Sequence, residues 1–246
     1  METGFGIDIG GSGIKGAPVD LSTGQLLTER CRIATPQPAT PLAVSGTVAE
    51  IVEIFQWNGP IGCTIPAVVQ KGVVHNATNI DKTWIGVSAE EMLTERLNRS
   101  AKVINDADAA GLAEMKFGAG AGYSEGKVVL VLTFGTGIGS TLFVNGQQVP
   151  NMELGDLELD GHNAEQHAAG RLREEDLVSW SEWTSRVERY LQHVENLFWP
   201  DLIIFGGGIS NLASEFLPHI KTRTLIVPAK LRNNAGITGA ALIAQA

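Results

Sequence analysis

One pattern of residues occurs twice in this chain: an apolar strand, a turn rich in glycine, and a second apolar strand. The first copy, FGIDIGGSGIKGAPV, covers residues 5–19, and the second, VVLVLTFGTGIGSTLFVN, covers residues 128–145. Each copy predicts a β-hairpin whose glycines let the backbone approach an anion closely. Because the strands, the turns and the hydroxyl positions all recur, we expect duplicated halves that face a shared phosphate-binding cleft.

The first hairpin also carries side chains suited to phosphoryl transfer. Asp8 lies among apolar residues, where an ionised carboxylate is costly to desolvate unless it is paired or faces a cation. Ser12 and Lys15 add a hydroxyl and a positive charge beyond the turn. An ordinary hairpin with a solvated Asp8 is the alternative, since glycine-rich turns are common. We expect phosphate to be bound at Gly10, Gly11, Ser12 and Lys15 in the first hairpin and at Thr133, Gly135, Thr136 and Gly137 in the second.

Composition limits the classes of protein that fit. A chain of 246 residues with 43% hydrophobic residues can bury a substantial core, as one large domain or two small ones. The net charge of −9 argues against general binding to nucleic acid or to membrane surfaces. Cys31 and Cys63 lack the spacing of metal ligands or of a disulfide framework, which favours a reducing cytoplasm. We expect neither a signal peptide, because no basic leader is present, nor a transmembrane helix, because no apolar run approaches about 20 residues.

The rest of the sequence predicts alternating strands and helices, which is typical of an α/β fold. We expect strands over residues 25–33, 60–63 and 101–104, and helices over residues 42–55, 90–97, 107–116, 180–198 and 236–246. The domain boundary is expected near residue 108. Residues 1–108 with 236–246 would then form a small N-terminal lobe, on which the last helix packs, and residues 109–235 a larger C-terminal lobe.

The two hairpins resemble the phosphate 1 and phosphate 2 loops of the actin, hexokinase and sugar-kinase superfamily. A third segment, PDLIIFGGGIS at residues 200–210, is similar to the late strand and the nucleotide-side glycine turn of that superfamily, with Gly207 and Gly208 in the turn. Within it, the chain resembles the ROK group of sugar kinases and repressors over essentially its whole length. This resemblance implies a two-lobed, ribonuclease H-like α/β fold with a duplicated β-sheet and a ligand cleft between the lobes.

The resemblance also implies a catalytic base and a set of sugar ligands. ROK kinases carry a segment closely similar to VINDADAAGLAE at residues 103–114, in which Asp106 is the base and Asn105 orients the sugar. Helix capping is the competing explanation, since Asn and Asp are preferred at helix N-termini, but the two phosphate loops favour catalysis. For Pro66 and Asn79 the competing explanation is an ordinary turn, and for the acidic residues of 151–170 it is a solvated loop. The remaining implied sugar ligands are Thr64, Pro66, Asn79, Gly137, Glu153, Asp156 and Glu165.

The chain departs from the ROK pattern at the zinc knuckle. Asp156 stands where the family has a His, and the knuckle's cysteines are missing, so we expect no structural zinc. The short, zinc-less form resembles the polyphosphate glucokinase group, as do SWSEW at residues 179–183 and LRNNAGITGAAL at residues 231–242. We expect Trp180, Trp183 and Trp199 to serve packing and to have no role in the site.

The resemblance therefore implies a hexokinase that uses inorganic polyphosphate, ATP or both to phosphorylate the 6-hydroxyl of glucose, and we include mannose as a second acceptor. Mg²⁺ is expected at Asp8, since hard oxygen ligands suit this ion, and a homodimer is the family expectation. Residues 216–246 contain no acidic residue, and a polyanionic donor requires positive charge beyond the two phosphate loops. A solvated basic face would explain the same charges. The basic residues of this segment are Lys221, Arg223, Lys230 and Arg232.

Three alternatives compete with this hypothesis. A strictly ATP-dependent ROK glucokinase or fructokinase is the nearest. A ROK repressor would need a DNA-binding helix-turn-helix, for which we see no room before a phosphate loop that starts at residue 5. An actin-like filament or chaperone ATPase would have no reason to carry the sugar residues.

Overall fold

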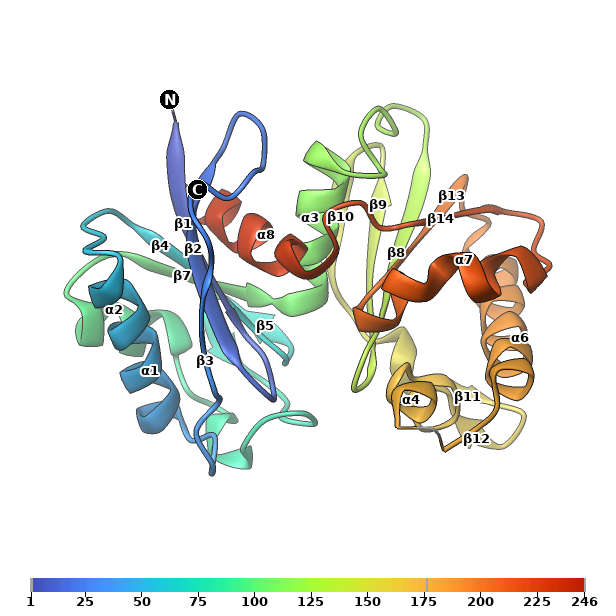
Figure 1. Ribbon diagram of the computed structural model, residues 1–246, viewed down its shortest axis with the longest axis horizontal. Coiled ribbons are helices and arrows are strands. Elements are labelled where there is room, and N and C mark those ends of the chain that lie inside the picture. Colours follow the sequence, from blue (N-terminus) through green and yellow to red (C-terminus); the bar gives the residue numbers. More distant parts are fainter. Residues whose placement is uncertain (1, 176, 246) are drawn as a thin grey trace. The chain divides into compact units, whose positions relative to one another are not determined.

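The computed structural model describes residues 2–175 and 177–245. The chain divides into two compact units. Unit 1 runs to Ala113 and resumes at Asn234, and unit 2 comprises Glu114–Asn233. Each unit contains one five-stranded mixed sheet (Figure 1). The boundary that we expect near residue 108 falls within α3 (Asp106–Phe117), which crosses the division.

The sheet of unit 1 has the strand order β3-β2-β1-β4-β7. The strands β1 and β2 form the first antiparallel hairpin, β3 pairs antiparallel with β2, and β4 and β7 run parallel to β1. Because β1, β4 and β7 are parallel, the residues that follow them lie at one edge of the sheet. Their bounds are β1 Thr3–Ile9, β2 Ile14–Asp20, β3 Cys31–Ile33, β4 Ile61–Ile65 and β7 Ala101–Asn105.

The sheet of unit 2 repeats this arrangement with the order β10-β9-β8-β13-β14. The strands β8 and β9 form the second hairpin, β10 pairs antiparallel with β9, and β13 and β14 run parallel to β8. Order and strand directions match position by position, which confirms the expected duplication of the sheet. The bounds are β8 Val128–Phe134, β9 Ile138–Val144, β10 Gln147–Met152, β13 Leu202–Gly206 and β14 Leu225–Pro228.

Helices cover both faces of the sheet in unit 1 (Figure 1). On one face, α1 (Pro41–Ile54) and α2 (Ala89–Leu97) pack on alternate residues of β1, such as Phe5 and Ile7. On the other face, α8 (Ala235–Ile243) lies against glycines of β1 and β4. A Cβ on Gly6 would lie 1.8 Å from the Ile237 carbonyl oxygen, and one on Gly62 would lie 1.8 Å from that of Ala240. Glycine in β1 and β4 therefore allows α8 to pack directly on the sheet backbone.

In unit 2, the long helix α6 (Trp180–Phe198) begins at Ser179, whose side chain accepts a hydrogen bond from the Glu182 N–H. It covers a core in which Phe134 of β8 stacks on Phe205 of β13 at 4.3 Å. Shorter helices and hairpins connect the main elements: β5 Val69–Gln70, β6 Val73–Val74, β11 Glu158–Leu159, β12 His162–Asn163, α4 Ala164–Ala168, α5 Arg171–Glu174, α7 Ala213–Phe216, and the 3₁₀ helices η1 Lys82–Trp84, η2 Leu154–Asp156, η3 Gly208–Leu212, η4 Leu217–His219 and η5 Arg232–Asn234.

Two buried glutamates hold the edge strand β14 at its two ends. Before the strand, the Glu195 carboxylate of α6 accepts hydrogen bonds from the N–H groups of Arg223 and Thr224. After it, the Glu114 carboxylate accepts those of Lys230 and Leu231 at 3.1 and 2.7 Å. The acid-free, basic segment of the chain is thus held at both ends through its backbone N–H groups. The Arg223 guanidinium adds hydrogen bonds to the Glu195 carbonyl at 3.1 Å and to Asn196 Oδ1 at 3.3 Å.

Two expectations differ from the structure. The strand expected over residues 25–33 is restricted to Cys31–Ile33. Its neighbour β2 contains Pro18, which has no N–H to continue a ladder and only accepts a hydrogen bond from the Leu27 N–H. Trp183 is buried as expected, whereas Trp199 is 67% exposed and lies beneath the Arg223 guanidinium at 3.7 Å. None of the helices in the described part of the chain has the length and apolar character that crossing a membrane demands.

Candidate active site

Asp8 is held in place by residues on two neighbouring strands. The β1–β2 register sets it opposite Lys15, whose Nζ lies 3.5 Å from Asp8 Oδ2. The register with β4 sets it beside Thr64, whose hydroxyl donates to Asp8 Oδ1 at 2.8 Å and accepts the Ile9 N–H. Thr64 is fully buried. Because its hydroxyl proton is donated to Asp8, Thr64 orients this carboxylate. Its expected contact with the sugar stays a prediction.

Residues 10–13 form the turn between β1 and β2, which we call the phosphate 1 turn. Residues of the segment that follows the hairpin support it. The Gly10 N–H donates to the Gly13 carbonyl at 3.1 Å, and the Thr35 hydroxyl donates to the Gly10 carbonyl. Arg32 Nη2 donates to the Ser12 carbonyl at 3.0 Å. A Cβ on Gly13 would lie 2.7 Å from Arg32 Nε, so this glycine leaves room for the guanidinium. Sequence reasoning missed Arg32 and Thr35, because nothing local links them to the turn.

A cavity of about 360 Å³ opens beside this turn within unit 1. This volume lies at the lower end of the range for small-molecule sites. It brings together the turn and two of the segments from which we expect sugar ligands. The cavity also includes polar residues that were not expected. Its lining includes Gly10, Gly11, Pro66 and Asn79 from the expected set, together with the polar residues Thr35, Gln37, Thr78 and Asp81.

Asn105 and Asp106 join the end of β7 to the start of α3. Asn105 Oδ1 accepts the N–H groups of Ala107 and Asp108 at 2.9 and 3.1 Å, so Asn105 caps the helix. Its Nδ2 donates to the Ala67 carbonyl at 3.1 Å, which links it to the loop after β4. Asp106 occupies the first helical position, where the partial positive charge of the helix N-terminus stabilises a carboxylate. Asp106 Oδ1 also accepts the Ala107 N–H at 2.9 Å, so both residues contribute to capping, and the catalytic role of Asp106 stays a prediction.

In unit 2, residues 135–137 form the turn between β8 and β9, which we call the phosphate 2 turn. Glu165, an expected sugar ligand, lies against this turn. The Gly135 N–H donates to the Gly137 carbonyl at 3.0 Å and closes the turn between β8 and β9. Glu165 Oε2 accepts the Ile138 N–H at 2.9 Å. A Cβ on Gly137 would lie 2.2 Å from the same oxygen, and one on Gly155 would lie 3.3 Å from it. Gly137 and Gly155 therefore make room for the Glu165 carboxylate against the turn.

The acidic segment is attached to the same hairpin. The Ser140 hydroxyl of β9 donates to the Met152 carbonyl at 2.6 Å and accepts the Leu154 N–H at 3.0 Å. This fixes η2, so Glu153 and Asp156, both exposed, flank buried Leu154. Burial and the nearby Glu165 carboxylate raise the pKa of Tyr190, which donates to the Leu154 carbonyl. The structure thus brings Gly137, Glu153, Asp156 and Glu165 to one part of unit 2.

The glycine turn after β13 packs on the phosphate 2 hairpin. Gly206 is paired with Thr133, and Gly207 has a φ of 86°, in the left-handed region. A Cβ on Gly207 would lie 2.1 Å from the Phe134 carbonyl oxygen, so only glycine fits. Because β8, β13 and β14 are parallel and adjacent, the phosphate 2 turn, Gly207–Gly208 and the loop with exposed Lys230 follow strand ends at one sheet edge.

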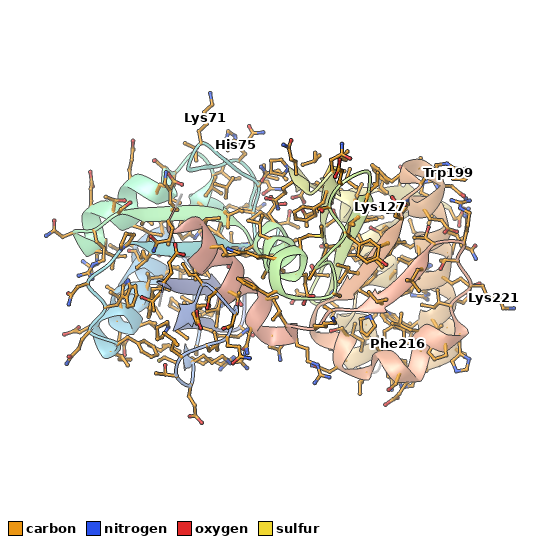
Figure 2. The ribbon with its side chains drawn as sticks, turned by 90° about the horizontal axis from the view of Figure 1, so that it is seen from above. Lys71, His75, Lys127, Trp199, Phe216 and Lys221 are labelled. Carbon is orange, nitrogen blue, oxygen red and sulfur yellow. The ribbon has the colours of Figure 1, made fainter. Side chains whose placement is uncertain are left out.

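The other basic pair of the acid-free segment lies before β14, at the opposite end of that strand. Arg223 packs on Trp199, and Figure 2 shows Trp199 and Lys221 at the surface. In the residues that the structure describes, no group of three or more His, Cys, Asp or Glu side chains is placed to hold a metal ion. His162 and His167 stack on each other with ring centroids 4.4 Å apart.

Comparison with known proteins places the chain among kinases. A polyphosphate glucokinase of Mycobacterium tuberculosis is 52% identical over 244 residues, which cover 99% of this chain and 91% of that protein. A glucokinase of Streptomyces coelicolor is 27% identical over 325 residues, covering 100% of this chain and 98% of that protein.

Solved structures give the same result. The inorganic polyphosphate/ATP-glucomannokinase from Arthrobacter sp. strain KM is 52% identical, with a TM-score of 0.95 and coverage of 100% of this chain and 99% of that one. A ROK family glucokinase from Streptomyces griseus, in complex with glucose and AMPPNP, shares the fold at 22% identity, with a TM-score of 0.84 and 99% of both chains covered. The sequence model of the ROK family matches residues 4–150. With this match and relatives that align along almost its full length, the chain belongs to the ROK family, as its two hairpins indicate.

Proposed function

We propose that this protein is a hexokinase that transfers a phosphoryl group from inorganic polyphosphate or ATP to the 6-hydroxyl of glucose, with mannose as a second acceptor. The observation that carries the proposal is the 52% identity, over nearly the full chain, to a polyphosphate glucokinase and a polyphosphate/ATP-glucomannokinase. The geometry supports it, because both phosphate hairpins and a carboxylate at a helix start are present.

Asp106 is the proposed base. When the sugar 6-hydroxyl oxygen forms its bond to the terminal phosphorus of the donor, the bond from that phosphorus to the bridging oxygen breaks, and Asp106 accepts the hydroxyl proton. The transition state of phosphoryl transfer is loose, so little basicity is required, and a carboxylate at a helix N-terminus is adequate. Asn105 holds the start of this helix and retains a second Nδ2 hydrogen, which we assign to a sugar hydroxyl.

The other sugar ligands are assigned by position. Asn79 and Pro66 line the cavity beside the phosphate 1 turn in unit 1. In unit 2, Glu165 contacts the phosphate 2 turn, and Glu153 and Asp156 flank η2. Ionised carboxylates accept hydrogen bonds, and amides both accept and donate them, which suits the paired hydroxyls of a sugar. We therefore assign Asn79 and Pro66, and Gly137 with the three acidic residues, to binding of the hexose.

The donor phosphates are assigned to the backbone amides of the two turns. Amides of Gly11, Ser12, Thr136 and Gly137 are suited to stabilising negative charge that develops on the transferred group, because they need no reorganisation. Lys15 contributes a point charge. The Gly207–Gly208 turn and the loop with Lys230 lie next to the phosphate 2 turn along the edge of the unit 2 sheet. They would supply further groups that bind phosphate. A donor with many phosphates would use these groups, whereas ATP needs fewer of them.

Asp8 fits the requirements of a magnesium ligand. Mg²⁺ in phosphoryl-transfer sites is held by one or two carboxylates together with substrate phosphates and water. Thr64 fixes one oxygen of Asp8, and the other lies 3.5 Å from the Lys15 amine. A bound Mg²⁺ would neutralise charge on the donor phosphates. We propose that activity depends on Mg²⁺ and that no structural zinc is required.

We further propose a homodimer in a reducing cytoplasm. Family resemblance supports the dimer, and the free state of Cys31 and Cys63 supports the compartment. Light scattering on the purified chain tests the dimer.

An activity matrix tests the proposed function. Polyphosphate and ATP are each combined with glucose, mannose, fructose and N-acetylglucosamine, and the sugar phosphate is quantified. We expect glucose 6-phosphate from both donors. Activity with ATP alone would favour the ATP-dependent kinase, and fructose as the best acceptor would favour the fructokinase.

A further inference from the structure

Arg171 begins the short helix α5 directly against the phosphate 2 turn. Its backbone N–H donates to the Gly135 carbonyl at 2.9 Å. The preceding residue is Gly170, on which a Cβ would lie 3.0 Å from the Phe134 carbonyl oxygen and 3.3 Å from the Gly135 nitrogen. The backbone at residues 170–171 is therefore packed on the turn without intervening side chains, and it fixes where the Arg171 side chain starts.

The Arg171 guanidinium has an unmet hydrogen-bonding requirement. Its Nε is buried and has no hydrogen-bond partner in the described part of the chain. Two residues later, the Nε of Arg173 is buried in the same way. The rest of the Arg173 guanidinium, however, lies over the Trp180 ring at 4.8 Å and donates from Nη1 to the Val178 carbonyl at 3.4 Å. A buried donor without a partner carries its full desolvation penalty, and native proteins keep few of them. An acceptor bound at Arg171 would remove this penalty.

The helix α5 also contacts the other phosphate-handling segment of unit 2. A Cβ on Gly208 would lie 2.9 Å from Glu174 Oε1, so the end of α5 lies at the glycine turn. One helical turn therefore joins the phosphate 2 turn, near Arg171, to the Gly207–Gly208 turn, near Glu174. An arginine at this position is well suited to phosphate, because its planar fork of donors matches two phosphate oxygens.

We propose that Arg171 binds the phosphoryl donor through a phosphate that is not transferred. This inference rests on the proposed function, and it adds a donor-binding residue outside the two hairpins and the glycine turn. The phosphate can belong to polyphosphate or to ATP, and the experiment separates these sources. In this proposal Arg171 contacts the donor and does not contact the sugar, so replacing Arg171 should not change the affinity for glucose.

The test compares three variants with the parent enzyme. Arg171→Gln removes the charge and the fork, and Arg171→Lys keeps the charge and removes the fork. Arg189→Gln is the matched control, because it removes the same charge from an exposed arginine of α6 that is paired with Asp160. For each protein, KM is measured for polyphosphate, ATP and glucose. Thermal stabilisation by tripolyphosphate without sugar is measured in parallel.

We expect Arg171→Gln to raise KM for at least one donor by about tenfold or more, with KM for glucose within about twofold of the parent value. Arg171→Lys should raise it by about threefold, and Arg189→Gln should match the parent. The donor whose KM rises identifies the phosphate that is bound. Unchanged donor KM values in folded Arg171→Gln, or equal rises for donor and glucose, would overturn the proposal.

Two further outcomes are also decisive. If Arg171→Gln does not fold, Arg171→Lys decides, because parent-like donor KM values in that variant would overturn the assignment. If the parent shows no kinase activity, the proposed function fails by itself. Stabilisation by tripolyphosphate that is present in the parent and lost in Arg171→Gln would still support a phosphate ligand, and retained stabilisation would refute it.

Discussion

Glu114→Gln tests how the basic loop after β14 is held. The Glu114 carboxylate is buried and accepts three backbone N–H groups, from Ala119 at 2.8 Å, Lys230 at 3.1 Å and Leu231 at 2.7 Å. Oε2 accepts the first two and Oε1 the third. A glutamine keeps one carbonyl oxygen for the first pair, but its NH₂ group then faces the Leu231 N–H. One buried N–H donor is left unsatisfied. The other two N–H groups then donate to a neutral amide oxygen and no longer to a charged carboxylate.

The expected cost follows from these three bonds. An unsatisfied buried N–H costs about 1–3 kcal/mol, and the two weakened bonds add about 1 kcal/mol, so the free energy of unfolding should fall by about 2–4 kcal/mol. With a urea m-value of about 3 kcal/mol/M, this corresponds to a midpoint shift of about 1 M. Urea unfolding followed by circular dichroism measures it.

Glu188→Gln is the matched control. Glu188 accepts a single backbone N–H, from Lys221 at 2.8 Å, in an exposed position. Its replacement should cost less than about 1 kcal/mol, because water can satisfy the Lys221 N–H. If Glu114→Gln were no more destabilising than this control, the loop would not depend on the buried carboxylate. Because this loop carries Lys230, we also expect Glu114→Gln to raise KM for polyphosphate.

Three further predictions follow from the charge, packing and burial of particular residues. Neutralising Lys230 and Arg232 together should raise KM for long polyphosphate more than KM for ATP, and the affinity for polyphosphate should fall steeply with salt; initial rates at several salt concentrations measure both. Gly6→Ala should lower the free energy of unfolding by about 3 kcal/mol, since its Cβ would meet the backbone of α8, and urea unfolding measures this loss. Burial raises the pKa of the Cys63 thiol to about 12, so iodoacetamide should modify Cys31 and spare Cys63 in the native protein, as peptide mass spectrometry would report.

Two of these predictions have a control variant within the chain, and Cys31 is the internal control for Cys63. Lys71 and Arg96 are exposed residues of unit 1, and neutralising both should leave the two donor KM values unchanged; Figure 2 shows Lys71 projecting from the surface. Gly46→Ala lies in α1, where the nearest side-chain atom is 4.0 Å from the new Cβ, and it should stabilise the protein by about 1 kcal/mol. Equal effects on both donors, a neutral Gly6→Ala or rapid labelling of Cys63 would contradict the corresponding argument.

Local patterns in the sequence predict the elements that depend on local chemistry. The glycine turns predict both hairpins, and the helix expected over residues 180–198 has the observed bounds of α6, which Ser179 caps. The strand before Asn105 is correct within one residue, because a buried apolar run ends there at a helix cap. The expectation of duplicated sheets is confirmed, because the recurring hairpin is the core of each sheet.

Long-range contacts are what the sequence cannot show. Thr64 donates a hydrogen bond to Asp8 because the register between β1 and β4 places the two residues side by side, and no local pattern specifies this register. Arg171 meets the phosphate 2 turn through a single backbone hydrogen bond, and Glu114 meets residues more than one hundred positions away. For Arg171 and Glu114 the contact uses backbone groups of the partner, so the partner leaves no signal in its own residue type. Arg171 could have been noticed only as an arginine that follows a glycine near the acidic segment.

The rate of glucose 6-phosphate formation from polyphosphate by Asp106→Asn tests the central claim most directly. The substitution keeps the shape of the side chain and removes the proton acceptor, so kcat should fall by at least about 10²-fold while the affinity for glucose stays close to that of the parent. Circular dichroism and the unfolding midpoint establish that the variant is folded. A folded Asp106→Asn enzyme with near-normal turnover would contradict the account, because phosphoryl transfer would then proceed without the base at the start of α3.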